Sequence, residues 1–164
     1  MDAQAYMQMV KSRFQPHLAV RRDTPDMYIV YEEIMRAEWL ATKLKITSVV
    51  TCVPSIEPEK FAAYTNQCLK DAIRHKKGLP RGFQNGVASF CTVASHRVSP
   101  SAIAFALSRP AKHFAAFSVP AIFDLSTDRL YHYRGDMIWG ALYTGFLNSY
   151  CEYHFSPYPP PYRG

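Results

Sequence analysis

The sequence lacks the glycine-rich patterns with which nucleotide-binding enzymes hold phosphate groups. It contains neither G-x-G-x-x-G nor G-x-x-x-x-G-K-[ST], the loops in which backbone amides approach a phosphate closely. A G-x-S-x-G nucleophile elbow is missing as well, and Cys91 lies in an alternating run, Ala88–Val93, that predicts a strand. The sequence therefore gives no support to dinucleotide or P-loop chemistry, and we interpret Cys91 as a buried structural thiol.

Paired metal ligands are also missing. None of the six histidines stands at HxH or HxxxH spacing, and the four cysteines form no CxxC pair. Cys151 and His154 lie three residues apart, but no second local pair completes a tetrahedral site. We therefore predict neither a metal site nor a cofactor. The cysteines fall within apolar patterns, which is typical of reduced, buried thiols: Cys52, Cys68, Cys91 and Cys151.

No stretch of the sequence predicts secretion or membrane insertion. The first residues, Met1–Gln4, lack the basic segment and the following apolar segment of a signal peptide. The longest membrane-like stretch, Met137–Leu147, has 11 residues, which is too short to cross a bilayer. We expect a soluble, cytoplasmic protein with no membrane partner.

The carboxylate pattern of a metal-dependent nuclease is not recognisable. Such an enzyme, often built on an αβββαβ core, needs an Asp on one strand and Glu-x-Lys on the next, so that two carboxylates hold Mg²⁺ beside the phosphate. Asp124 ends an expected strand, but the following strand, Arg129–Tyr133, supplies no Glu-x-Lys. Asp124 and Asp128 instead fit a turn in which carboxylates accept hydrogen bonds from nearby backbone. A divergent nuclease stays open as an alternative.

The composition predicts one folded domain. The chain has 164 residues, of which 48% are apolar and 20% charged, enough to bury a core. The expected elements follow the order α-β-β-α-β-α-β-β-α, which predicts a single α+β domain with one mixed β-sheet and helices packed on it. The domain spans residues 1–155, and the Pro/Tyr-rich tail, 156–164, is expected to be extended or disordered.

Local signals place several elements. Asp2 predicts the N-cap of an opening helix that Pro16 ends, and Pro58 predicts the first turn of a long second helix. Ser99 predicts the cap of a short helix, apolar all round from Ala102 to Leu107 and therefore expected to be buried.

The region before the second helix is ambiguous. Residues 32–43 have helix propensity, yet the β-rich runs 27–31 and 44–53 on either side favour a hairpin-like pair of strands. Residues 21–26 read as a polar link that leads into the first strand.

The net charge of +6 is concentrated in one segment. Residues 70–82 carry five basic residues and one acid, a local charge of +4. Cations clustered at a loop can neutralise phosphates, and an aromatic ring beside them can stack on a base. The candidate nucleic-acid contacts are Lys70, Arg74, Lys76, Lys77, Arg81 and Phe83. The alternative needs no ligand, because cations in the last turn of a helix also complement its macrodipole.

The last expected helix has two uncharged faces. One face is apolar, includes Trp139 and Phe146, and is expected to be buried. The other carries small and neutral side chains where a solvent-facing helix normally carries charges. Either another element of the same chain or a second subunit packs there. The candidate interface residues are Ile138, Ala141, Thr144, Gly145 and Asn148.

Together these patterns favour a small non-catalytic binding or regulatory module. We expect it to contact nucleic acid through residues 70–83 and to form a homo-oligomer or bind a protein partner. Two other classes stay open: the divergent nuclease, whose carboxylates would converge in a cleft, and a structural subunit of a larger assembly, which would expose a large apolar face.

Overall fold

The fold is described from a computed structural model. The description covers residues 1–36, 39, 42–75, 85–111, 113–136 and 141–159. Within these residues, no helix is long and apolar enough to cross a membrane.

The described residues form one six-stranded mixed sheet whose strand order follows the chain, from β1 to β6. Strands β1, β2 and β3 form an antiparallel meander, β3, β4 and β5 run parallel, and β6 pairs antiparallel with β5. The strands are β1 (Ala19–Asp23), β2 (Met27–Met35), β3 (Lys43–Cys52), β4 (Asn85–Ser95), β5 (Ala116–Asp124) and β6 (Arg129–His132). The helices are α1 (Ala3–Ser12), α2 (Pro58–His75), α3 (Pro100–Leu107) and α4 (Ala141–Phe155).

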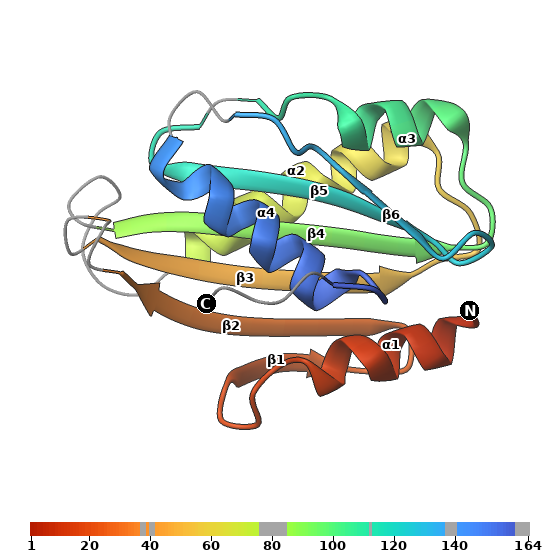
Figure 1. The fold of residues 1–164 in the computed structure, drawn as a ribbon, viewed down its shortest axis with the longest axis horizontal. Coiled ribbons are helices and arrows are strands. Elements are labelled where there is room, and N and C mark those ends of the chain that lie inside the picture. The colour runs from red at the N-terminus through yellow and green to blue at the C-terminus, as the bar shows by residue number, and fades with distance from the viewer. Residues whose placement is uncertain (37–38, 40–41, 76–84, 112, 137–140, 160–164) are drawn as a thin grey trace.

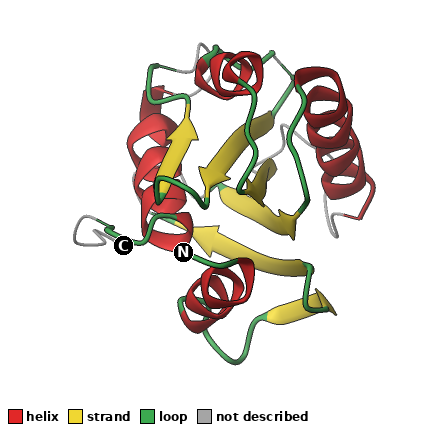
Figure 2. Cartoon of the chain, turned by 90° about the vertical axis from the view of Figure 1, so that its right-hand side faces the viewer, coloured by secondary structure: helices red, strands yellow, loops and turns green. Residues whose placement is uncertain are grey.

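Helices cover both faces of the sheet. Figure 1 looks onto the face that α4 crosses, with α1 beside it near β1 and β2, and with α2 behind the sheet. Figure 2, turned by 90°, shows the sheet edge-on between helices. Helices α1 and α4 share one buried cluster with the strands, and α2 and α3 share another. The parallel pairs explain this arrangement, because α2 and α3 are the crossovers that joining parallel strands requires.

Strand β4 lies at the centre of the sheet and is buried along its whole length. Its side chains alternate between the two faces, so that Phe90 belongs to the α1–α4 cluster and Cys91 to the α2–α3 cluster. The strand expected from Ala88–Val93 is present, but its pattern is not a strict alternation. A strand covered on both faces carries an almost continuous apolar run, and Val87–Ala94 is apolar except for Ser89 and Thr92.

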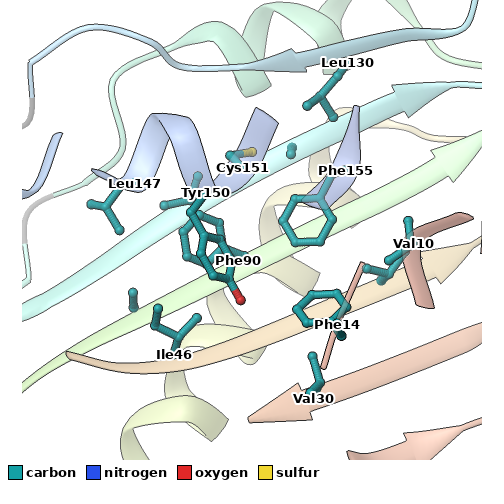
Figure 3. Packing of buried hydrophobic residues seen from close by; sticks show 14 of the residues in the cluster. Val10, Phe14, Val30, Ile46, Phe90, Leu130, Leu147, Tyr150, Cys151 and Phe155 are labelled. Atoms are coloured by element: carbon teal, nitrogen blue, oxygen red, sulfur yellow. The ribbon is translucent and has the colours of Figure 1, made fainter. Parts of the chain in front are cut away.

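The α1–α4 cluster is rich in aromatic rings. Figure 3 shows Tyr150 of α4 beside Phe90 of β4, with Phe155 and Phe14 next to them. The ring centroids of Tyr150 and Phe90 are 4.5 Å apart. Tyr6 of α1 stacks on Phe123 of β5 with centroids 4.1 Å apart. These contacts join both termini of the domain to the centre of the sheet.

The start of the expected tail is held against α1. The guanidinium of Arg13 donates to the carbonyl oxygens of Tyr153, Ser156 and Pro157, the last at 3.3 Å. Ser156 is buried as a result.

The predicted α+β class with one mixed sheet is confirmed, and so are several local signals. Asp2 accepts a hydrogen bond from the Ala5 amide at 2.7 Å, and Ser99 accepts one from the Ala102 amide at 3.3 Å. In the ambiguous region 32–43, residues 32–35 belong to β2 and Lys43 begins β3, and the two strands pair antiparallel. Arg36, Trp39 and Thr42 belong to neither strand. Phe146 is buried as expected, whereas Trp139 lies outside the described residues.

Two expectations were wrong. The polar link, residues 21–26, overlaps β1 (Ala19–Asp23), an additional strand that pairs with β2. Helix α3 is only half covered: Ala102 and Ala106 are buried, but Leu107 is 45% exposed. An apolar composition all round the helix did not require burial all round, because α3 lies at the periphery of the sheet and presents one face to it.

Candidate nucleic-acid interface

A cleft of about 370 Å³ opens between α2 and the β1–β2 end of the sheet. Helix α2 packs mainly on β3, β4 and β5, so the same face of β1 and β2 is left beside it. Alternate residues of β2, Met27 and Ile29, line the floor of the cleft and are half-buried. Tyr64, Asp71 and His75 line it from α2.

A β-bulge supplies the cations of the cleft. The register of β1 against β2 shifts between Val20 and Arg22, and such a bulge bends the strand and re-aims its side chains. Arg21 and Arg22 consequently both line the cleft, although side chains of consecutive strand residues normally point to opposite faces. Both arginines are exposed.

Contacts with the chain itself position these arginines. The guanidinium of Arg21 lies 4.9 Å from the centroid of the Tyr31 ring, and it donates to the carbonyl oxygen of His75 at 3.5 Å. That contact joins the edge of the sheet to the last turn of α2. Arg22 donates to the sulfur of Met27 at 3.3 Å.

Tyr64 forms a wall of the cleft. Its hydroxyl is 2.7 Å from Oγ1 of Thr51, and burial raises its pKa, so the phenol stays protonated. Tyr64 also lines a second cleft of about 430 Å³, together with Glu57 and Phe61 near the start of α2. The two clefts therefore share an aromatic wall.

The cleft also contains one carboxylate. Asp71 of α2 accepts a hydrogen bond from the side-chain amide of Gln67 at 3.0 Å, and its carbonyl oxygen lies 2.8 Å from Nδ1 of His75. The cleft is therefore cationic at its β1 side and mixed in charge along α2.

The structure places only part of the predicted basic set. Lys70 and Arg74 are exposed and lie four residues apart on α2, which puts them on one face of the helix. Neither lines the cleft, but both lie beside it, on the turns of α2 that carry Asp71 and His75. Lys76, Lys77, Arg81 and Phe83 lie outside the described residues.

Sequence reasoning missed Arg21 and Arg22. The adjacent arginines were visible as a charged pair, but they were assigned to a link, and nothing in the local pattern connected them with a helix about 50 residues later.

Comparison with known proteins adds no relative. The chain matches no protein-family model, and neither the curated proteins nor the solved structures give a significant match. Any function assigned to it therefore depends on the residues of the chain itself.

The candidate interface residues on α4 lie in different environments. Thr144 is buried, Gly145 is exposed, and Asn148 donates from its side-chain amide to the carbonyl oxygen of Arg134 at 3.0 Å. Ile138 and the side chain of Ala141 lie outside what the structure describes. A subunit interface on this strip stays a prediction.

Gly145 allows that prediction to be tested without disturbing the core. A Cβ atom at Gly145 would meet nothing within 4 Å, so Gly145→Arg is expected to fold. If the strip joins two subunits, this variant becomes monomeric by light scattering, because it buries a charge in the interface. The matched Gly145→Ala keeps the interface and raises the free energy of unfolding by about 0.5–1 kcal/mol. Equal masses for Gly145→Arg and the wild type would remove the strip as an interface.

The order of helices and strands fits the nuclease alternative, but the carboxylates of β2 do not form a metal site. With β1 included, the chain begins α1-β1-β2-β3-α2-β4, the αβββαβ order of many metal-dependent nucleases. The carboxylates of β2 have partners within the chain, however. Glu32 accepts a hydrogen bond from Tyr150, and Glu33 lies 3.9 Å from the buried ammonium group of Lys45.

Asp124 serves a turn, as predicted. Its carboxylate accepts hydrogen bonds from the amide of Ser126 at 2.8 Å and the hydroxyl of Thr127 at 2.9 Å. In the part of the chain that the structure describes, no group of three His, Cys, Asp or Glu side chains could hold a metal ion.

Proposed function

We propose that this protein is a small non-catalytic binding module that contacts single-stranded nucleic acid through the cleft between α2 and β1. The observation that carries the proposal is the convergence of cations from two distant parts of the sequence. Arg21 and Arg22 of β1 line the cleft, and Lys70 and Arg74 of α2 lie on the neighbouring exposed face. Cations arranged along one surface favour a polyanion, because binding releases the counterions condensed on it.

The size and lining of the cleft favour an unpaired base over a duplex. A volume of about 370 Å³ falls within the range of small-ligand sites, roughly 300–1,000 Å³. A duplex keeps its bases stacked and cannot insert one into such a cleft, whereas a single strand can. Tyr64 and the half-buried Tyr31 supply aromatic rings beside the cations, the combination used by proteins that bind single strands without reading a sequence.

A cytoplasmic location belongs to the same proposal. Each of the four cysteines is a free thiol, and free thiols persist in the reducing compartments where nucleic acids are also present.

The test compares two double variants that remove the same charge. Arg22→Ala with Arg74→Ala removes one cation from each side of the cleft, and Arg109→Ala with Arg129→Ala removes two exposed arginines near the opposite sheet edge. Fluorescence anisotropy with a labelled single-stranded oligonucleotide is expected to show binding about tenfold weaker for the cleft variant than for the wild type. The slope of log K against log salt falls by about 1.4, roughly 0.7 for each phosphate that the variant no longer neutralises.

Three results would overturn this function. They are wild-type protein with no affinity for the oligonucleotide at low salt, equal losses in the two double variants, and a clear preference for duplex over single strand. The first would leave helix-end electrostatics as the explanation for Arg74, which lies in the last turn of α2.

A further inference from the structure

Two cysteines lie against each other beneath the cleft. Cys68 of α2 and Cys91 of β4 belong to the same buried cluster, where α2 packs on β4. Each of the two thiols affects the pKa of the other, as neighbouring groups do. The Tyr64 hydroxyl, 2.7 Å from Oγ1 of Thr51, also affects the pKa of Cys68.

The two cysteines have different access to small molecules. Cys68 is 6% exposed and lines the cleft, whereas Cys91 is fully buried in the central strand. A reagent that enters the cleft therefore reaches the sulfur of Cys68 first, and Cys91 stands behind it.

The surroundings of the two cysteines also differ in their effect on the pKa. Hydrogen bonding from Cys91 lowers the pKa of Cys68, against an opposing effect of burial, and hydrogen bonding from Tyr64 lowers it further. Burial raises the pKa of Cys91 well above its usual value. Thiolate character, which makes a cysteine a nucleophile, is thus concentrated on the sulfur that faces the cleft.

We propose that Cys68 and Cys91 form a reversible redox site, in which hydrogen peroxide that enters the cleft oxidises Cys68 and Cys91 then closes a disulfide between α2 and β4. This site is independent of what the cleft binds.

The two steps balance without any other reactant. The Cys68 thiolate attacks one peroxide oxygen, the O–O bond breaks, and Cys68 sulfenic acid and hydroxide form, so sulfur is oxidised and peroxide reduced by two electrons. The Cys91 sulfur then attacks the Cys68 sulfur, the S–O bond breaks, and the proton of Cys91 leaves with the departing hydroxide as water. The net reaction converts two thiols and one peroxide into one disulfide and two waters.

Cys52 provides an internal comparison. It is more exposed than Cys68, but burial of the sulfur, with the nearby Asp26 adding to the effect, raises its pKa to about 11. The pKa of Cys68 is instead lowered from its ordinary value, so Cys68 holds more thiolate than Cys52 at neutral pH and is expected to react with peroxide first.

The experiment uses the wild-type chain. The reduced protein is treated with stoichiometric hydrogen peroxide, the remaining thiols are alkylated under denaturing conditions, and the digest is mapped by mass spectrometry. We expect a peptide pair linked through Cys68 and Cys91, which disappears on reduction, with Cys52 and Cys151 still alkylated. Oxidation of Cys52 ahead of Cys68, or a Cys68 that stays a thiol after Cys52 has reacted, would overturn the proposal.

Two variants separate the roles. Cys91→Ala leaves Cys68 without its resolving partner, so a 1,3-dione probe is expected to trap the sulfenic acid on Cys68. Tyr64→Phe keeps the ring but removes one donor, and it is expected to slow peroxide consumption at Cys68 several-fold while the disulfide still forms. If Cys68 still forms a disulfide with another thiol in Cys91→Ala, as readily as the wild type forms its disulfide, Cys91 is not the resolving thiol.

Discussion

Replacing Tyr150 with alanine is expected to lower the free energy of unfolding by about 5 kcal/mol. Tyr150 is fully buried between Phe90 and Phe155, and removal of a core aromatic costs about 3–5 kcal/mol. Its hydroxyl also donates to the carboxylate of Glu32 and lies 3.1 Å from the hydroxyl of Ser48. Leaving buried partners without a hydrogen bond costs about 1–3 kcal/mol more. Urea or guanidinium denaturation measures the change.

Tyr150→Phe is the matched control. It keeps the ring and removes only the hydroxyl, so it is expected to cost about 1–3 kcal/mol. Equal losses in the phenylalanine and alanine variants would show that ring packing contributes nothing. A loss below about 2 kcal/mol for alanine would contradict the central position given to this residue.

The second large effect is a loss of stability at alkaline pH caused by His132. The buried imidazole lies 3.0 Å from the Glu152 carboxylate through Nε2 and 3.1 Å from the carbonyl oxygen of Tyr133 through Nδ1. Both ring nitrogens thus face acceptors, which suits the doubly protonated ring. Burial alone would lower the pKa of His132, but the Cys151 sulfur and Glu152 outweigh it and raise the pKa to about 10.

The direction of this pH effect follows from the pH at which the folded and the unfolded chain each release the proton of His132. The unfolded chain releases it near pH 6.5 and the folded chain near pH 10. The stabilisation is complete below pH 6.5 and is lost as pH rises through 10. With at most about 1.4 kcal/mol for each pH unit, the total loss is about 3–5 kcal/mol, measurable by chemical denaturation at a series of pH values.

Glu152→Gln isolates this contribution. Glu152 also pairs with Arg134 at 2.6 Å, so the variant is less stable near neutral pH. Its main signature is a flatter dependence of stability on pH between 6.5 and 10, because the pKa of His132 falls without the carboxylate. A slope equal to that of the wild type would show that Glu152 does not raise the pKa of His132.

The periodic spacing of apolar residues predicted the elements that bury one face. It missed β1, which buries none. The apolar face of the last helix, which includes Phe146, and the strand pattern of β4 could both be recognised in the sequence, because burial selects apolar residues at a fixed spacing. Strand β1 is exposed at all of its residues, so no such selection acts on it. Its strand conformation comes from hydrogen bonds to β2, and a pattern of side chains does not report backbone pairing.

The candidate site was predictable only on its α2 side. The excess of cations after residue 70 was visible, and it led to Lys70 and Arg74. The cleft also needs Arg21 and Arg22, which reach it through a bulge in β1. The pairing of Cys68 with Cys91 likewise depends on α2 crossing the sheet at β4. Contacts between distant segments are set by packing, and neither local composition nor spacing carries that information.

The sequential strand order has a consequence for synthesis on the ribosome. Because spatial order equals chain order, each strand that leaves the exit tunnel pairs with the strand made just before it, and the sheet grows from one edge in the direction of translation. The face opposite α2 is different, since α4, made last, supplies much of its cover. Until α4 has emerged, a nascent chain thus carries a nearly complete sheet on which Phe90 and Ile46 lack the cover of α4, and exposed apolar surface of this kind is prone to aggregate.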